Sequence, residues 1–179
     1  MVRHGETQLN VEDRYGGKLD VPLTDKGIKQ AEELVLRLEE YTFTKVLCSP
    51  LIRAKQTAEI IVSHRMVPLQ ILSDLSERSF GVYEGLTKQE ISMKYPELFA
   101  INCTHLLNQA PYNGESLLEF ENRIKKVLTL IVTSYTDENI LVVTHGFVAM
   151  MINKIVNNVS FDEMFSFHLG NCEILKITI

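Results

Sequence analysis

The stretch NILVVTHG, residues 139–146, decides the fold of this chain. Its centre is a short continuous run of aliphatic residues bounded by polar ones, which is typical of a strand buried on both faces inside a parallel sheet. Helices must then cover both faces of that sheet. The stretch therefore predicts an α/β fold in which His145 and Gly146 directly follow an interior strand.

Outside this stretch, strand-like and helix-like patterns alternate along the chain. Apolar residues at helical spacing, together with capping residues and Pro50, predict helices over residues 24–38, 50–63, 87–95, 116–135 and 147–156. Further strands are predicted at the start of the chain, ahead of the Arg3-His4 motif, and over residues 45–49, 69–72 and 172–179. This order predicts a three-layer α/β/α sandwich with a mostly parallel sheet, folded as a single domain over residues 1–179. Residues 97–113 follow neither pattern, so we expect an irregular lid there.

Composition and charge limit the classes of partner. The chain has 179 residues, of which 45% are hydrophobic and 23% charged, and its net charge is -5. An acidic chain lacks the basic face that nucleic acids and anionic membranes require, so we expect neither as a partner. The three cysteines lack paired spacing, which indicates reduced thiols in a cytoplasmic protein. The sequence does not decide the oligomeric state, and a homodimer is one option that it allows.

Polar residues gather at the predicted carboxyl ends of the strands. Arg3-His4-Gly5-Glu6-Thr7 follows the first strand, with Asn10 further on. Ser49 to Arg53 follows the second strand, and His145-Gly146 follows the strand over 139–144. Ligands of open α/β sheets bind at this edge, so two histidines and two arginines should meet in one crevice. The sequence therefore predicts an anion site.

Phosphate suits these residue types. The arginine guanidinium is a planar fork of donors that matches phosphate oxygens. A neutral imidazole is a competent nucleophile near neutral pH, and nearby guanidinium charges disfavour a second positive charge on His4. The glycines after each histidine, Gly5 and Gly146, allow backbone N–H groups to approach an oxyanion closely.

Four sequence blocks carry a family resemblance. RHGET with Asn10, SPLIRAKQTA, LSERSFGVYEG and VVTHG resemble, in the same order, the signature blocks of the histidine phosphatase superfamily, also called phosphoglycerate mutase-like. The resemblance implies a metal-independent phosphatase in which His4 is phosphorylated and Glu77 donates a proton to the leaving group. It implies no cofactor and a small-molecule phosphate ester as substrate. It further implies a phosphate pocket of Arg3, Arg53 and His145, and substrate contacts from Asn10, Gly17, Arg78 and Gly146.

Two other carboxylates compete with Glu77 for the role of proton donor. Glu84 lies in the same block, and Glu6 is close to His4 along the chain. The donor must hold a proton near neutral pH, so it needs a raised pKa. We favour Glu77 because the LSER block aligns it with the donor of the family.

Three alternative functions remain open. Residues His4, His145 and Glu77 could ligate zinc, although two neighbouring arginines would repel a cation. A phosphoglycerate mutase-type phosphotransferase would use the same nucleophile, and Arg78 matches one of its positions. However, Ser79-Phe80-Gly81 resembles the α-ribazole and broad-specificity phosphatase branch, and residues 97–113 contain no Lys or Arg. A non-catalytic domain that binds a phosphorylated ligand is the third alternative, disfavoured by the intact nucleophile and donor.

The remaining features give weaker signals. His64 and His168 fall outside the motifs, so we expect them to be exposed or hydrogen-bonded structural residues, whereas His105 lies in the lid and is a weak candidate for substrate contact. The lid is rich in apolar and aromatic residues, including Phe99 and Tyr112. We therefore expect an organic phosphate monoester with apolar or sugar-like bulk.

Overall fold

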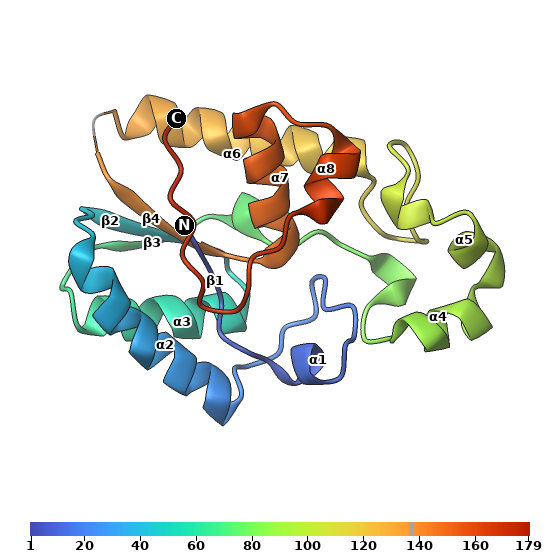
Figure 1. Ribbon diagram of the computed structural model, residues 1–179, viewed down its shortest axis with the longest axis horizontal. Helices are drawn as coiled ribbons and strands as arrows, with labels where there is room; N and C mark the ends of the chain where they lie inside the picture. The colour runs from blue at the N-terminus through green and yellow to red at the C-terminus, as the bar shows by residue number, and fades with distance from the viewer. Residues whose placement is uncertain (137) are drawn as a thin grey trace.

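One parallel sheet forms the centre of the computed structural model, which describes residues 1–136 and 138–179. Its strands lie in the order β1-β4-β2-β3 (Figure 1), with bounds Val2–Arg3, Ile140–Thr144, Lys45–Cys48 and Leu69–Ile71. The predicted interior strand is β4, which pairs with β1 on one side and β2 on the other, in parallel register. The prediction from residues 139–146 is confirmed.

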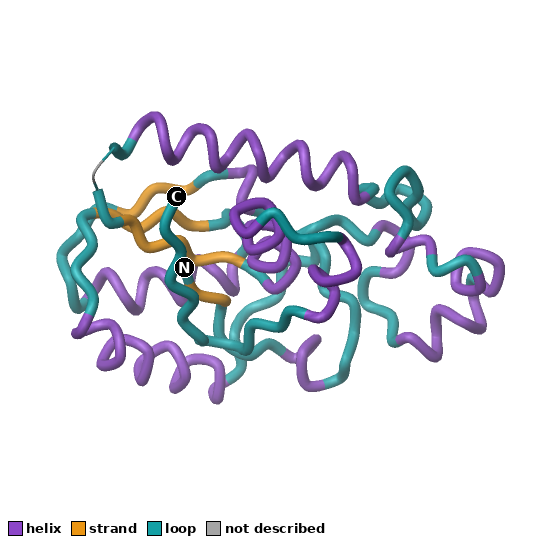
Figure 2. The backbone as a smooth tube through the Cα atoms, turned by 45° about the horizontal axis from the view of Figure 1, so that its top comes forward, coloured by secondary structure: helices purple, strands orange, loops and turns teal. Residues whose placement is uncertain are grey.

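Helices cover both faces of the sheet (Figures 1 and 2). Their bounds are α1 Gln8–Val11, α2 Asp25–Arg37, α3 Ile52–Ser63, α4 Lys88–Lys94, α5 Pro96–Ala100, α6 Leu117–Ser134, α7 Gly146–Asn157 and α8 Phe161–Ser166. The helices α2 and α3 lie on one side of the sheet, and α6 and α7 lie on the other. The predicted three-layer α/β/α arrangement is confirmed. No helix among the described residues is both long and apolar enough to cross a membrane.

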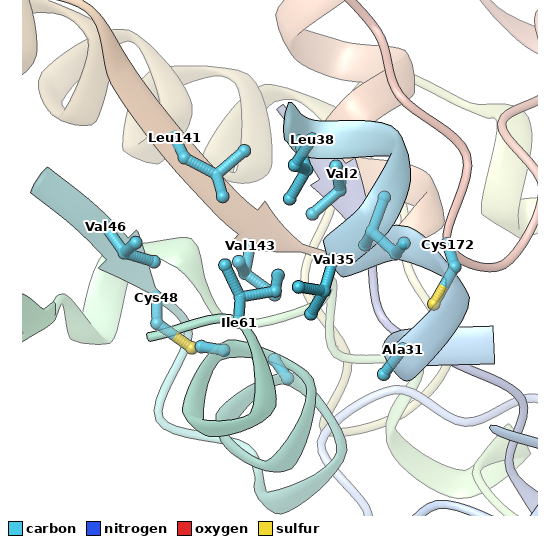
Figure 3. Close-up of a cluster of buried hydrophobic side chains, with 13 residues drawn as sticks. Val2, Ala31, Val35, Leu38, Val46, Cys48, Ile61, Leu141, Val143 and Cys172 are labelled. Carbon is cyan, nitrogen blue, oxygen red and sulfur yellow. The ribbon is translucent and has the colours of Figure 1, made fainter. Parts of the chain in front are cut away.

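Each face of the sheet has its own hydrophobic core. Figure 3 shows the first, in which Val143 of β4 and Val46 of β2 meet Val35 of α2 and Ile61 of α3. The second core lies under α6 and α7 and includes Phe120. Burying an aliphatic or aromatic side chain of this size contributes roughly 1.5–3 kcal/mol, so these two clusters dominate the stability of the fold.

Side-chain caps start the helices at the residues that the sequence indicates. The hydroxyl of Thr24 accepts a hydrogen bond from Gly27 N at the start of α2. Capping boxes begin α4 at Thr87 and α6 at Ser116. Such caps satisfy backbone N–H groups that the first helical turn leaves without partners.

The predicted strand over residues 172–179 is wrong. That segment makes one antiparallel bridge, from Ile174 to Val2, and forms no strand. The neighbouring strand β1 is two residues long, so it offers the segment pairing at one position.

Several short elements are also absent from the predictions. The irregular lid over residues 97–113 instead begins inside α5, and Cys103–His105 forms a 3-10 turn. The helices α1, α5 and α8 have four to six residues, which is too short to show a helical period.

A cavity of about 630 Å³ lies at the amino end of β4, beside the C-terminal segment, and includes Ile140 and Ile177 in its lining. None of the predicted site residues lines it. Those residues lie at the opposite, carboxyl end of the strands.

A close backbone approach fixes the loop after β1. Gly5 packs against Gly27 in the first turn of α2, and a Cβ atom added to Gly27 would overlap the carbonyl oxygen of Glu6. Thr24 N also donates to Glu6 O at 2.9 Å. The loop that follows His4 is therefore held directly against the start of α2.

The contact between Gly27 and Glu6 O predicts that Gly27→Ala changes stability in the direction opposite to that expected from helix propensity. Alanine normally stabilises a helix interior by about 1 kcal/mol relative to glycine. At Gly27 the overlap with Glu6 O should dominate, so Gly27→Ala should lower the free energy of unfolding by about 1–3 kcal/mol in urea denaturation. The matched control is Glu32→Ala on the exposed face of α2, expected within about 0.5 kcal/mol of wild type. A stabilised Gly27→Ala variant would contradict the prediction.

Candidate active site

The predicted site residues converge at the carboxyl edge of the sheet. Arg3 ends β1 and His4 follows it, Arg53 lies in the first turn of α3 after β2, and His145 links β4 to α7. Glu77 comes from the loop between β3 and α4. Thr144 Oγ1 donates to Leu75 O at 2.9 Å, which ties that loop to the end of β4. Parallel pairing thus assembles residues that are up to 142 positions apart, from 3 to 145.

The hydrogen bonds of His4 leave its Nε2 atom unprotonated, as the predicted nucleophile requires. Its Nδ1 lies 2.7 Å from the Gly5 carbonyl oxygen, which can only accept, so Nδ1 carries the ring proton. The Nε2 lone pair therefore faces the crevice, where Arg53 Nε donates to it at 3.2 Å. Burial, followed by the charges of Arg53 and Arg3, lowers the pKa of His4 well below its usual value. The imidazole is thus neutral at physiological pH.

The loop over residues 16–19 holds the Arg53 guanidinium in place. Its NH1 donates to Leu19 O at 2.6 Å and its NH2 to Gly17 O at 2.8 Å. Gly17 has a φ of +48°, and an added Cβ there would overlap the Glu84 carboxylate. Gly17 therefore acts through its backbone, by positioning Arg53.

Two buried polar atoms in the crevice have no hydrogen-bond partner among the described residues. They are Arg3 Nε and His145 Nδ1. Arg3 is anchored by a 2.9 Å bond from NH1 to Leu169 O, and the ring of His145 lies edge-on to His4 with centroids 5.1 Å apart. Buried polar groups almost always have partners, so these two atoms point to a ligand with acceptor oxygens.

Glu77 has the environment of a proton donor. Its Oε1 accepts from Arg78 N at 2.9 Å and its Oε2 from Phe147 N at 3.2 Å. Burial raises the pKa of Glu77, while these two bonds and the charges of Arg53 and Arg3 oppose the rise. A carboxyl with a raised pKa can hold a proton at neutral pH and deliver it to a leaving oxygen.

The two rival carboxylates are engaged elsewhere. Glu84 Oε1 accepts from Phe80 N at 2.9 Å and from Lys18 N at 3.1 Å, so it joins two loops. Glu6 pairs with Lys26 at 2.7 Å, and this hydrogen bond lowers the pKa of Glu6. The ion pair of Glu6 disfavours a protonated carboxyl there.

The other predicted contact residues have defined positions. Arg78 is fully buried, and its guanidinium donates to the carbonyls of Glu115 at 2.9 Å and Thr104 at 2.6 Å. Asn10 Oδ1 accepts from Thr7 N at 3.0 Å in the capping box of α1. Gly146 begins α7, with its Cα side facing Arg3. Substrate contact by these three residues stays a prediction.

Two residues that contact the catalytic histidines had no predicted role. Asn171 Nδ2 donates to the His4 carbonyl at 2.9 Å, and Ser49 Oγ lies 2.7 Å from His145 Nε2. Ser49 belongs to the SPLIRAKQTA block, so the sequence did signal its neighbourhood. Asn171 lies in the C-terminal segment, far from any block, and carries no such signal.

The charge of the crevice favours an anion over a metal ion. The guanidinium groups of Arg3 and Arg53 flank both histidines, and they would repel a cation. Among residues 1–136 and 138–179, no cluster of three or more His, Cys, Asp or Glu side chains is placed to hold a metal. The remaining three histidines are exposed and are not among the crevice residues described above. They are His64, His105 and His168.

Comparison with known sequences decides the family. The sequence pattern of the histidine phosphatase superfamily (branch 1) matches residues 1–179. The chain belongs to this superfamily. The resemblance carried by the four sequence blocks is therefore confirmed.

Relatives within the histidine phosphatase superfamily include both phosphatases and a mutase-like protein. The adenosylcobalamin/alpha-ribazole phosphatase of Salmonella typhimurium is 36% identical over 157 residues, which is 87% of this chain and 78% of that protein. Phosphoglycerate mutase-like protein 4 of Arabidopsis thaliana is 40% identical over 150 residues, which is 82% of this chain and 65% of that protein. The crystal structure of the alpha-ribazole phosphatase of Shigella flexneri superposes with a TM-score of 0.87 at 32% identity, covering 96% of this chain and 85% of that one. The phosphoglycerate mutase-like fold is thus confirmed.

The environment of Glu77 predicts how hydrolysis depends on the leaving group and on pH. Glu77→Gln should lower kcat for an alkyl phosphate by about 10²- to 10⁴-fold, because an alkoxide needs a proton to leave. It should affect p-nitrophenyl phosphate far less, since that leaving group is a weak base. In the wild type, kcat for the alkyl ester should fall as pH rises through the raised pKa of Glu77, and the variant should lack this alkaline limb. Glu6→Gln is the matched control and should keep the wild-type profile. Equal losses on both esters would contradict the donor role.

Proposed function

We propose that this protein is a metal-independent phosphomonoesterase that hydrolyses a small organic phosphate through a phosphohistidine at His4. One observation carries the proposal: His4, with an unprotonated Nε2 whose present partner is Arg53 Nε, lies at the same edge of the sheet as the buried Glu77 carboxyl, whose pKa is raised. The lowered pKa of His4 favours the neutral imidazole that a nucleophile requires, and the raised pKa of Glu77 favours the protonated carboxyl that an acid requires.

The first step forms the phosphohistidine. The His4 Nε2 lone pair attacks phosphorus, and the bond from phosphorus to the ester oxygen breaks. Glu77 gives its proton to the leaving oxygen, so the alcohol departs neutral. The proton on His4 Nδ1 remains on that nitrogen and is donated to the Gly5 carbonyl oxygen. This hydrogen bond stabilises the positively charged ring. The guanidinium groups of Arg3 and Arg53 stabilise charge on the equatorial oxygens.

The second step returns the enzyme to its starting state. The Glu77 carboxylate takes a proton from water, and the oxygen of that water attacks phosphorus. The bond from phosphorus to Nε2 breaks, and inorganic phosphate leaves. Glu77 is then protonated and His4 is neutral, ready for the next substrate.

Features of the lid favour hydrolysis over mutase transfer. A mutase must bind a phosphorylated acid in two orientations, which calls for basic groups near its carboxylate. Residues 97–113 contain no Lys or Arg. The Arg78 guanidinium donates to Thr104 O and Glu115 O, so two of its donors are already taken.

The leaving-group side of the crevice supports an ester with apolar or aromatic bulk. Phe147 N contacts Glu77, and the ring of Phe147 lies 6.4 Å from that of Phe165 in α8. The lid residue His105 stacks on Phe165 with centroids 3.9 Å apart. We call the rings of Phe147, Phe165 and His105 the aromatic wall, which is linked to Glu77 through the backbone N–H of Phe147. The Salmonella relative is named as an adenosylcobalamin/alpha-ribazole phosphatase, and such an ester fits this substrate class.

The state of the cysteines supports a cytoplasmic location. Cys48, Cys103 and Cys172 are buried free thiols. Free thiols persist in reducing compartments, so we place the enzyme in the cytoplasm.

Hydrolysis of p-nitrophenyl phosphate, together with a phosphoglycerate transfer assay, separates the proposed phosphatase from the three alternative functions. We expect turnover that resists EDTA and falls by at least about 10³-fold in His4→Ala, since the nucleophile is lost. The matched control is His64→Ala, an exposed histidine, which should keep full activity. Loss of turnover with EDTA would support a metal enzyme, and no turnover at any pH would support a binding domain. Phosphate transfer between phosphoglycerates in excess of hydrolysis would support a mutase.

The aromatic wall makes a separate prediction about substrate preference. Phe165→Ala should raise KM about 10-fold or more for a nucleotide-like monoester and leave KM for glycerol phosphate unchanged, because the lost contact is apolar. The matched control is Phe161→Ala in the same helix. The Nζ atom of Lys154 lies 4.4 Å from the centroid of the Phe161 ring, so the ring is covered and this variant should change neither KM. A wild-type preference for small carboxylate-bearing phosphates would contradict the substrate class while leaving the phosphatase assignment intact.

A further inference from the structure

Ser49 is a fully buried hydroxyl in contact with a catalytic histidine. It directly follows β2, and its backbone N–H donates to Val143 O of β4 at 3.1 Å. Its Oγ lies 3.3 Å from Leu51 N and 2.7 Å from His145 Nε2. The hydroxyl is therefore fixed between one backbone amide and one imidazole nitrogen.

These two contacts determine the direction of the bond to His145. The Leu51 amide can only donate, so Ser49 Oγ accepts from it. The hydroxyl proton is then free to be donated, and His145 Nε2 is the one further partner that Ser49 Oγ has among the described residues. The opposite arrangement, with Nε2–H donating to Oγ, would leave a buried hydroxyl proton without an acceptor. Nε2 is therefore the acceptor.

The tautomer of His145 follows from this direction. Burial, then the charges of Arg53, His4 and Arg3, lower the pKa of His145 well below its usual value, so the ring carries one proton. With Nε2 accepting, that proton is on Nδ1. Nδ1 is the buried atom that has no partner among the described residues.

The position of Nδ1 indicates which group its proton can bind. The two nitrogens lie on opposite sides of the ring, and Nε2 is turned toward Ser49 on the β2 side of β4. Nδ1 is therefore turned away from Ser49, and the rings of His145 and His4, the residue that follows β1, have centroids 5.1 Å apart. A phosphoryl group on His4 Nε2 would bring acceptor oxygens to this space.

We propose that Ser49 is a positioning residue that holds His145 in the Nδ1–H tautomer, so that His145 presents a donor to the phosphoryl oxygens. The proposal rests on the phosphatase function above. In the other tautomer a lone pair would face the oxygens, and His145 would repel the group it must bind. A wrong tautomer costs a catalytic histidine most of its effect even where its position is unchanged.

Nitrogen-15 NMR of the ligand-free protein tests the tautomer directly. Long-range proton–nitrogen correlations distinguish a protonated Nδ1 from a protonated Nε2 in a neutral imidazole. In the wild type we expect His145 with a protonated Nδ1, and in Ser49→Ala a shift toward the Nε2–H form. A wild-type His145 protonated on Nε2 overturns the proposal. This measurement needs no activity, so it is independent of the phosphatase assignment.

Anion binding and kinetics test the consequence. Ser49→Ala should weaken the binding of inorganic phosphate and lower kcat for p-nitrophenyl phosphate, each by about 10- to 100-fold, as expected for the loss of one preorganised donor. Ser49→Thr retains the hydroxyl and should restore both values and the Nδ1–H signal. The matched control is Ser76→Ala, which removes an exposed hydroxyl bonded to Ser73 O and should change neither.

The outcomes separate a positioning role from a structural one. If Ser49→Ala retains the Nδ1–H tautomer but loses activity together with stability, the hydroxyl serves packing and the proposal fails. If Ser49→Ala loses the tautomer without any change in phosphate affinity, the proposed role also fails. If wild-type protein has the Nδ1–H tautomer and binds phosphate but hydrolyses no ester, the phosphatase function fails while the positioning role stands.

Discussion

The parallel pairing of β4 with both β1 and β2 is the constraint on which the rest of the structure depends. It buries Val143 between two helical layers and sets the register in which Val2 and Cys48 face that residue. Because the three strands end at the same edge, the residues that follow them are brought together whatever their separation in sequence. The hydrophobic core and the catalytic crevice are thus two consequences of one register, and a change that disturbs it would affect both.

Burial has opposite effects on the pKa values of the proposed nucleophile and the proposed acid. It lowers the pKa of His4 and raises the pKa of Glu77, so in each case it favours the neutral form. Guanidinium charges reinforce the first shift and oppose the second. The charges of Arg53 and Arg3 therefore favour the neutral form of His4, whereas the protonated form of Glu77 is favoured by burial alone. The crevice therefore keeps nucleophile and acid ready without a metal ion in the proposed steps.

Local signals in the sequence account for much of the fold. The run over residues 139–144, the caps at Thr24 and Ser116, and the strand-end motifs of His4 and His145 act over a few residues, so they can be read without the tertiary structure. Two elements lack such a local signal. They are the strand wrongly predicted over residues 172–179 and the helix α8, which was not predicted. The first depends on the length of a neighbouring strand, and the second is too short to establish a period. The roles of Glu84 and Gly17 likewise depend on loops that meet only after folding.

The sequence by itself determined the chemistry, because residue types and their places after strands are local properties. It named His4, Arg53, Glu77 and His145, and it indicated an anion as their ligand. The tertiary structure alone decided the protonation states and tautomers, because these depend on burial and on hydrogen-bond partners from distant segments. The carbonyl beside His4, the hydroxyl of Ser49 and the burial of Glu77 become effective through folding. In the proposed mechanism, these contacts make the four residues a nucleophile, an acid and a phosphate site with assigned protons.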